Sequence, residues 1–197
     1  MTDIPTSIVD PNKILMTGEN PFVRLSEKDD DNYSTSVSFW RMTFCPEGPG
    51  HVLFAKSELT DGEWRIWTDN EAMTRWLQRT IQGMLSPELK DESIAAKAAT
   101  FEKRGNPLTS YREIIRSGSD EIACAWSDMR EPMLLHTQPG TPAGRPYGLA
   151  TVFVPARKAT FSINGHDAAG QAWERERDGR PFSTSSLAFS ESWTEPM

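Results

Sequence analysis

The amino-acid sequence predicts a mostly β protein, an antiparallel barrel of about nine to ten strands with one amphipathic helix at about residues 68–85. Short runs rich in β-branched and aromatic residues recur along the chain, separated by turn residues at regular spacing. The apolar fraction of 37% is low, which suits a sheet with one face in water. Apolar residues at helical spacing form one strong segment.

Length and composition favour one folded domain. The 197 residues can bury one core, and seven Trp and nine Phe supply bulky groups that disordered chains lack. Residues 1–32 are rich in Asp, Pro, Asn and Ser and are expected to form an extended N-terminal segment. Residues 33–197 are then expected to form a single β-barrel domain with the helix inserted.

The charge and the cysteines limit the partners and the compartment. A net charge of −7 and a pI near 5.1 argue against nucleic acid and anionic membranes. No run approaches the 18 apolar residues of a membrane span, and the first residues lack the features of a signal peptide. Cys45 and Cys124 lie in apolar runs and are predicted to be buried free thiols. These observations together predict a cytoplasmic protein.

The first strands are expected before residue 68. Residues 36–44 are β-branched and aromatic, and the Pro- and Gly-rich loop 45–50 separates them from a second strand at 51–55. An Asp-Gly turn then leads into residues 63–67, which alternate as a strand does.

The predicted helix follows directly. Thr68 and Glu71 fit a capping box, with Thr68 as the N-cap residue. The expected buried stripe consists of Met73, Trp76, Leu77, Ile81 and Met84. The expected outer face carries Arg75, Gln78, Arg79 and Gln82. If the barrel is open at one end, this helix is the natural lid, and the site should lie beneath it.

After residue 99 the pattern returns to strands punctuated by turns. The predicted strands are residues 110–116, 121–127, 133–137, 148–154, 159–163, 171–177 and 185–193. Exposed edges of such a sheet would allow a homodimer.

Three residues are candidates for acid–base catalysis. His136 lies in an apolar strand, and an imidazole titrates near neutrality; the alternative is a buried, hydrogen-bonded core histidine. Asp128 would share a strand face with Trp126, where desolvation would raise its pKa, unless it already belongs to the following turn. Glu174 would be a buried acid that needs a partner such as Arg41 if its face of strand 171–177 points inward; otherwise the charges are a solvated face.

Further residues are candidates for substrate contacts. Arg41 could hold an anionic group, and the aromatic walls could be Trp40, Trp126, Tyr111 and Trp173, whose alternative role is core packing. The three histidines lack metal-ligand spacing, so no metal site is predicted. The sequence has no P-loop, dinucleotide fingerprint or nucleophile elbow, so we expect no cofactor.

The stretch 163–176, which reads Ile-Asn-Gly-His-Asp-Ala-Ala-Gly-Gln-Ala-Trp-Glu-Arg-Glu, resembles the Gly-x-Ala-Trp-x-Glu-Arg strand of calycin-like proteins related to carotenoid 1,2-hydratase. The resemblance implies a lipocalin-type barrel and an apolar small ligand, and several such proteins are enzymes that act without a cofactor. This chain departs from that group in its length, which suffices for one barrel, and in the early position of its helix. The resemblance carries over no catalytic residue.

The sequence therefore predicts an enzyme of hydratase, lyase or isomerase type that acts by cofactor-independent acid–base chemistry. Its substrate would be a small apolar or aromatic molecule inside the barrel. The alternative is a non-catalytic, lipocalin-like carrier for small hydrophobic ligands. An interaction protein is a third hypothesis.

Overall fold

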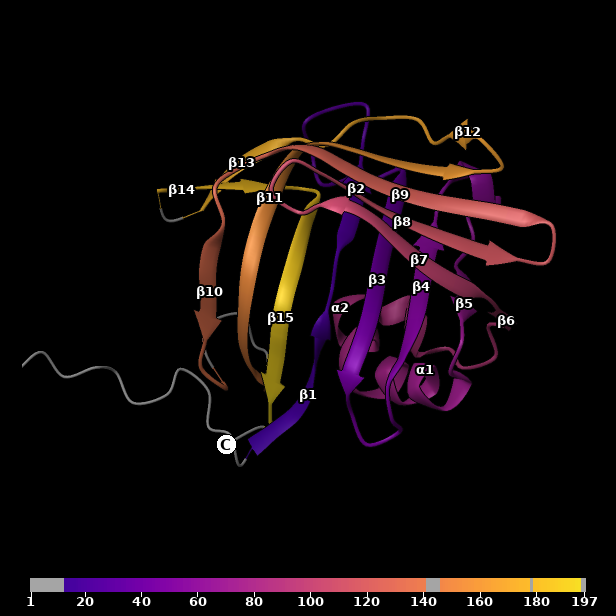
Figure 1. Cartoon of the computed structure of the whole chain (residues 1–197), viewed down its shortest axis with the longest axis vertical. Helices are drawn as coiled ribbons and strands as arrows, with labels where there is room; N and C mark the ends of the chain where they lie inside the picture. Colours follow the sequence, from indigo (N-terminus) through magenta and orange to yellow (C-terminus); the bar gives the residue numbers. More distant parts are fainter. Residues whose placement is uncertain (1–12, 141–145, 178, 196–197) are drawn as a thin grey trace, which may run out of the picture.

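The computed structural model describes residues 13–140, 146–177 and 179–195, and it is mostly β, as the sequence predicts (Figure 1). Its strands are β1 (Ile14–Glu19), β2 (Phe22–Leu25), β3 (Thr35–Phe44), β4 (Gly50–Lys56), β5 (Arg65–Thr68), β6 (Ala96–Ala98), β7 (Thr100–Asn106), β8 (Ser110–Ser117), β9 (Asp120–Met129), β10 (Met133–Thr137), β11 (Gly148–Ile163), β12 (His166–Asp167), β13 (Glu174–Arg177), β14 (Arg180–Ser183) and β15 (Ser186–Thr194). This number exceeds the predicted one, because short strands such as β6, β12 and β14 carry too few residues for a periodicity. The short strand expected from the apolar run 22–25 is present as β2.

One large sheet contains 13 of these strands, and its pairs are antiparallel apart from β5 with β6. The main path runs β6-β5-β4-β3-β1-β15-β11-β9-β8-β7, and β13 and β14 form a separate hairpin. β6 and β7 lie at opposite ends of this path yet are joined by a single residue, Ala99. The chain itself thus links the two ends of the sheet, although no ladder between described strands joins them.

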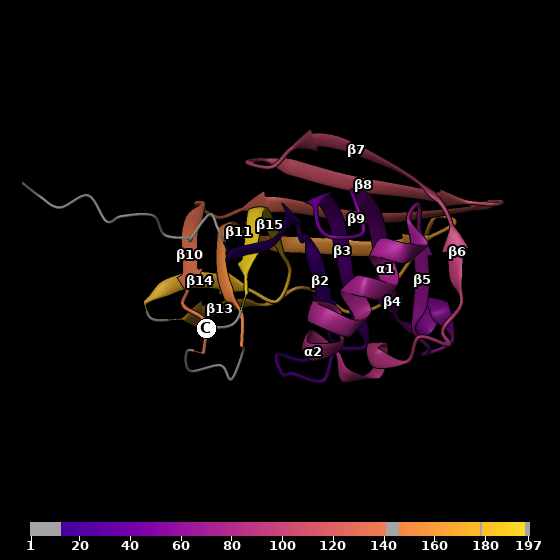
Figure 2. The same cartoon turned by 90° about the horizontal axis from the view of Figure 1, so that it is seen from below.

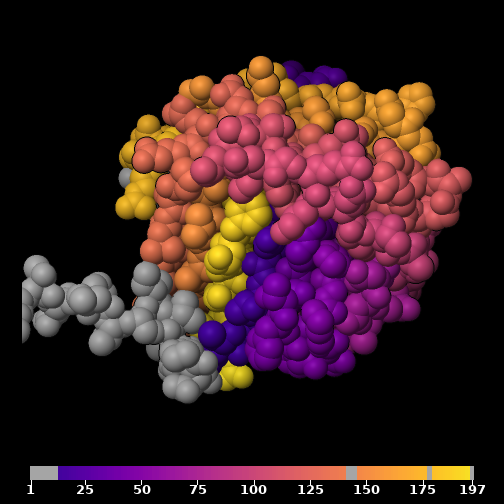
Figure 3. Space-filling model, in the orientation of Figure 1, coloured from indigo at the N-terminus to yellow at the C-terminus, as the bar shows by residue number. Residues whose placement is uncertain are grey.

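The sheet folds over itself, so that the molecule has layers. Figure 2 shows β7, β8 and β9 on one side of β3 and β4 and the helices on the other, and Figure 3 shows the surface of the β7 and β8 side. The sheet has two parts, one from β6 to β15 and one from β9 to β7, and β11 connects them. Residues 156–163 of β11 pair with β9, and residues 148–155 pair with β15.

Two apolar clusters fill the spaces between these layers. On β3, Val37 and Phe39 point into a cluster shared with Tyr111 and Trp126 of β8 and β9. The alternate residues of β3, such as Trp40, point into a second cluster shared with the helical segment. Both faces of β3 are therefore buried, as expected for a strand between two layers.

The N-terminal segment is not separate from the sheet. β1 lies between β3 and β15 in the centre of the main path, and β2 pairs with β3 and β15. Met16 and Val23 are fully buried. The described part of the segment 1–32, which the sequence set apart from the domain, therefore contributes two strands to it.

The predicted helix exists, but its start and its buried face differ from the expectation. Thr68 ends β5, and the helix N-cap is Asn70, whose side chain accepts a hydrogen bond from the Met73 amide at 3.0 Å. The helical segment consists of α1 (Glu71–Leu77), a π-helical turn η3 (Gln78–Gln82) and α2 (Gly83–Leu85). The expected stripe is buried, with Met84 only partly so.

Gln78 and Gln82, expected on the outer face, are also fully buried. The π-helical turn adds a residue to the turn and so shifts the side chains that follow it around the axis. Gln78 donates to the carbonyl oxygen of Leu89 at 2.9 Å, which satisfies part of its buried amide. Cys45 and Cys124 are buried free thiols, as predicted.

Candidate functional site

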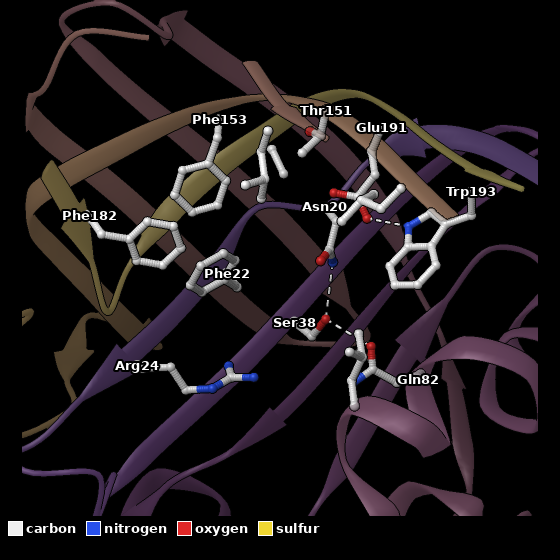
Figure 4. Close-up of a pocket in the computed structure, with 14 residues that line it drawn as sticks. Asn20, Phe22, Arg24, Ser38, Gln82, Thr151, Phe153, Phe182, Glu191 and Trp193 are labelled. Atoms are coloured by element: carbon white, nitrogen blue, oxygen red, sulfur yellow. Dashed lines mark hydrogen bonds between the residues drawn. The ribbon is translucent and has the colours of Figure 1, made fainter. Parts of the chain in front are cut away.

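A cavity of about 300 Å³ lies on the helix-covered face of the sheet, beyond the end of the helical segment (Figure 4). Such a volume is at the lower end of the range for small-molecule sites. Its walls come from β2, β3, β10, β11, β14 and β15 and from the last helical turns. The lining residues are Asn20, Phe22, Arg24, Ser38, Gln82, Leu85, Leu135, Leu149, Thr151, Phe153, Phe182, Ala188, Glu191 and Trp193.

Three phenylalanines form an aromatic wall at one end of the cavity. The rings of Phe153 and Phe182 are stacked, with centroids 4.6 Å apart and an interplanar angle of 14°. Phe22 is tilted against Phe153 at 5.9 Å. These rings come from β2, β11 and β14, so only the folded sheet brings them together. Aromatic faces of this kind hold planar apolar groups.

Buried polar groups lie along the opposite wall. The Asn20 amide donates to Ser38 Oγ at 3.1 Å, and Ser38 donates to Gln82 Oε1 at 2.9 Å. Trp40 Nε1 donates to the same Gln82 oxygen at 2.8 Å. The π-helical turn thus points Gln82 at β3, where its amide oxygen fixes the orientation of the Ser38 hydroxyl and the Trp40 indole. Fully oriented donors and acceptors preorganise a site for a defined ligand.

A buried carboxylate lies further along the same cavity. Glu191 on β15 is 3% exposed, and its Oε1 accepts a hydrogen bond of 2.6 Å from the Trp193 indole. Ser190 just before it has a φ of 49°, so the backbone breaks the regular alternation of β15 at this point. Ala188, Glu191 and Trp193 consequently all line the cavity, with spacings of three and two residues.

Arg24 supplies a positive charge to the cavity. Its Nη1 donates to the carbonyl oxygens of Val23 and Val37 at 3.1 and 2.6 Å. Its guanidinium carbon lies 5.9 Å from the centre of the Phe22 ring. Burial lowers the pKa of Arg24 to about 10. Among the residues that the structure describes, no carboxylate lies within ion-pair distance of this guanidinium.

The three predicted acid–base residues do not line this cavity. His136 is exposed on β10, and it alternates with Leu135, which does line the cavity; the alternative of a buried core histidine is wrong. Asp128 is exposed as well, because its φ of 55° interrupts the alternation that would have placed it beside Trp126.

Glu174 is exposed on β13 rather than buried against Arg41. Its Oε1 lies 3.1 Å from Arg157 Nε and 3.5 Å from Arg130 Nε. Asp128 lies 3.5 Å from Arg157, so this arginine brings two of the three candidates together at the surface. Ion pairs between groups this exposed contribute little to stability.

Arg41 and Tyr111 meet in a buried charge network on the other side of the sheet. Arg41 pairs with Glu19 at 2.7 Å and with the fully buried Glu113 at 2.9 Å. Tyr111 donates to Glu113 at 2.6 Å. Burial raises the pKa of Glu113 despite the opposing effect of Arg41, and burial together with Glu113 raises the pKa of Tyr111. Arg41 thus already has two carboxylate partners.

The predicted aromatic contacts lie outside the cavity as well. Trp126 is buried beside Tyr111, with ring centroids 6.1 Å apart, and donates to the Phe22 carbonyl at 3.0 Å. Trp173 is partly buried and donates to the Ser26 carbonyl at 3.2 Å. Trp40 packs under the helix and reaches the cavity only through Gln82. These positions correspond to the packing alternative.

No family model, curated protein or solved structure matches this chain. Fold and cavity alone therefore define its class: a mostly β protein with a small cavity on the helix-covered face of its sheet. Within residues 13–140, 146–177 and 179–195, no group of three or more His, Cys, Asp or Glu side chains could hold a metal ion. No helix in the same ranges is long and apolar enough to cross a membrane.

Proposed function

We propose that this protein binds a small, partly aromatic molecule in the cavity lined by Phe22, Phe153, Gln82 and Glu191. The observation that carries the proposal is the composition of that cavity, in which an aromatic wall faces buried and oriented polar groups. Mutual hydrogen bonds hold these buried polar groups in a defined orientation at the cavity wall. They fit a site that recognises a ligand by hydrogen bonds and holds its apolar part.

The cavity takes the place of the barrel interior that the sequence suggested. Between the two parts of the sheet, Phe39, Trp67 and Trp126 are at most 1% exposed and belong to one packed cluster. A ligand there would have to displace core side chains, whereas the cavity beside the helical segment is already formed. The relationship to calycins, the homodimer and the cytoplasmic location remain predictions from sequence.

Fluorescence titration tests the proposal. Trp193 lines the cavity, so a bound aromatic molecule should quench its emission, and Trp193→Phe should remove that quenching. Trp64→Phe is the matched control, because Trp64 lies outside the cavity lining and donates to Glu88. If a panel of one- and two-ring aromatic compounds gives neither quenching nor heat of binding, the proposal is wrong.

A second candidate function is acid–base catalysis on the bound molecule, with Glu191 as the acid or base. It is favoured by the position of this buried carboxylate in the cavity lining. It would replace His136, Asp128 and Glu174 in the role that the sequence suggested. Glu191→Gln should then abolish turnover of a substrate while keeping its binding within a few-fold. If turnover survives this substitution, Glu191 is not the catalytic group.

A further inference from the structure

Arg24 and Arg41 are two partly buried arginines in contrasting surroundings. Arg41 lies between two carboxylates at 2.7 and 2.9 Å. Within the described residues, the guanidinium of Arg24 on the short strand β2 donates to the carbonyl oxygens of Val23 and Val37 and lies over the Phe22 ring. A partly buried cation with no opposite charge beside it in the described part of the chain is costly, and the fold keeps one here at the wall of a cavity.

The hydrogen bonds of Arg24 leave one edge of its guanidinium group without an acceptor. Both contacts to carbonyl oxygens use Nη1, and within the described residues Nε and Nη2 have no acceptor. These two nitrogens lie side by side on the rigid plane of the group and match the spacing of the two oxygens of a carboxylate. The carbonyl contacts hold the plane in place, which preorganises the unused edge.

We propose that the cavity takes a small aromatic carboxylate, whose two oxygens accept hydrogen bonds from Nε and Nη2 of Arg24. This inference rests on the proposed function, since it names the chemical class of the molecule that the cavity binds. The pair is charge-assisted and bidentate, the strongest hydrogen-bond arrangement available to an arginine.

The remaining walls determine the rest of the molecule. Phe22, beside the guanidinium, and Phe153 give an aromatic ring apolar contact next to the carboxylate. The volume of about 300 Å³ corresponds to roughly ten water molecules, which suits an acid of one or two rings. Figure 4 shows Glu191 on the far side of Asn20 from Arg24. A second carboxylate on the ligand would approach Glu191, so monocarboxylates are favoured over dicarboxylates.

Calorimetry with matched acids and amides tests the inference. The probes are cinnamate and 2-naphthoate, each compared with its primary amide, which has almost the same shape but no charge. The wild-type protein should bind each acid roughly tenfold to a hundredfold more tightly than its amide, the range expected for charge-assisted hydrogen bonds. Arg24→Met should reduce this preference to within about twofold, because the acid loses the charge-assisted pair and the amide loses only a neutral acceptor contact.

Two further variants sharpen the result. Arg24→Lys keeps the charge but not the paired donors, so it should retain only part of the preference. Arg79→Met, on the exposed outer side of the helical segment, is the control and should behave as the wild type. Circular dichroism and the thermal midpoint of each variant establish that it is folded.

The outcomes separate this inference from the function on which it rests. If acid and amide bind equally to the wild type, or if Arg24→Met keeps the preference, the carboxylate site is wrong while the binding function stands. If dicarboxylates bind better than monocarboxylates, the assignment to monocarboxylates is wrong. If neither the acids nor the amides nor any neutral aromatic compound binds, both the proposed function and the carboxylate site are wrong.

Discussion

Arg41 stabilises the charged form of Glu113, a fully buried carboxylate. The side chain of Glu113 is 0% exposed and lies 2.9 Å from Arg41. Removing one partner of a buried pair costs about 3–5 kcal/mol, because the other is left without compensation. We therefore expect Arg41→Met to lower the free energy of unfolding at pH 7 by about 3 kcal/mol. Urea denaturation of the variant and the wild type measures this difference.

The loss of stability in Arg41→Met should depend on pH through the protonation of Glu113. Burial raises the folded-state pKa of Glu113 above its ordinary value of 4.5, and loss of Arg41 should raise this pKa further. Between the unfolded and folded pKa values, the folded variant binds a proton that the unfolded chain lacks, so its stability falls as the pH rises. The deficit of Arg41→Met should thus shrink toward pH 4.5. It should also shrink in the double variant with Glu113→Gln, and a deficit independent of both changes would contradict the prediction.

Single residues of the cavity could not be assigned to it from the sequence alone. Arg24 interrupts the apolar run of β2, and that single charge between apolar neighbours was the available signal. The place of Arg24 in the cavity depends on its contact with Val37 and on other lining residues such as Gln82, and both are distant from it in sequence. The prediction for Asp128 was wrong for a local reason. Its positive φ moves the side chain off the strand face that strict alternation assigns to it.

At the scale of elements, two residues compete for the N-cap position of α1, and the strand before the helix determines which of them takes it. Thr68 and Asn70 are both good N-cap residues, but Thr68 pairs with Val52 in the β4–β5 ladder. Asn70 takes over the cap and also donates to the carbonyl oxygens of Glu47 and Pro49 at 3.2 and 3.0 Å. The helix therefore begins only after the strand has ended.

We expect Asn70→Ala to lower the free energy of unfolding by about 1–2 kcal/mol, the usual cost of losing an N-cap. Asn70→Asp is the matched variant, because a carboxylate can still accept from the Met73 amide but cannot donate to the preceding loop. It should therefore lose less than the alanine variant. Equal losses in the two variants would indicate that the loop contacts, and not the cap, matter. Thermal and urea denaturation supply the values.

Hydrophobic periodicity predicted the helix and several strands, since alternation and helical spacing are local properties. The buried stripe of Met73, Leu77 and Ile81 is an example. The π-helical turn was not predictable in this way, because it changes the face of Gln82 without changing the spacing in sequence. The π-helical turn brings Gln82 into the cavity lining. A prediction that assumes regular helical spacing therefore places this residue on the wrong face.

At the scale of the whole molecule, the order of the strands is the part that no local pattern contains. β1 pairs with β15, near the other end of the chain, and this pairing closes the cavity wall on which Glu191 lies. The sequence predicted a site beneath the helix, whereas the cavity lies beyond its end, with Gln82 and Leu85 as the helical residues in its lining. The two clusters on either side of β3 are joined through this strand, so we expect the layers to unfold together.

Thiol labelling tests that cooperativity. Cys124 is fully buried on β9, between β8 and β11, and burial raises the pKa of its thiol, so it should react only after the sheet opens. In a Cys45→Ala variant, the free energy of opening at Cys124 should equal that of global unfolding within about 1 kcal/mol and fall equally with urea. Cys45, in the loop after β3 and 5% exposed, should open at lower cost in a Cys124→Ala variant. A Cys124 opening that is nearly independent of urea would mean that the β7–β9 layer opens alone.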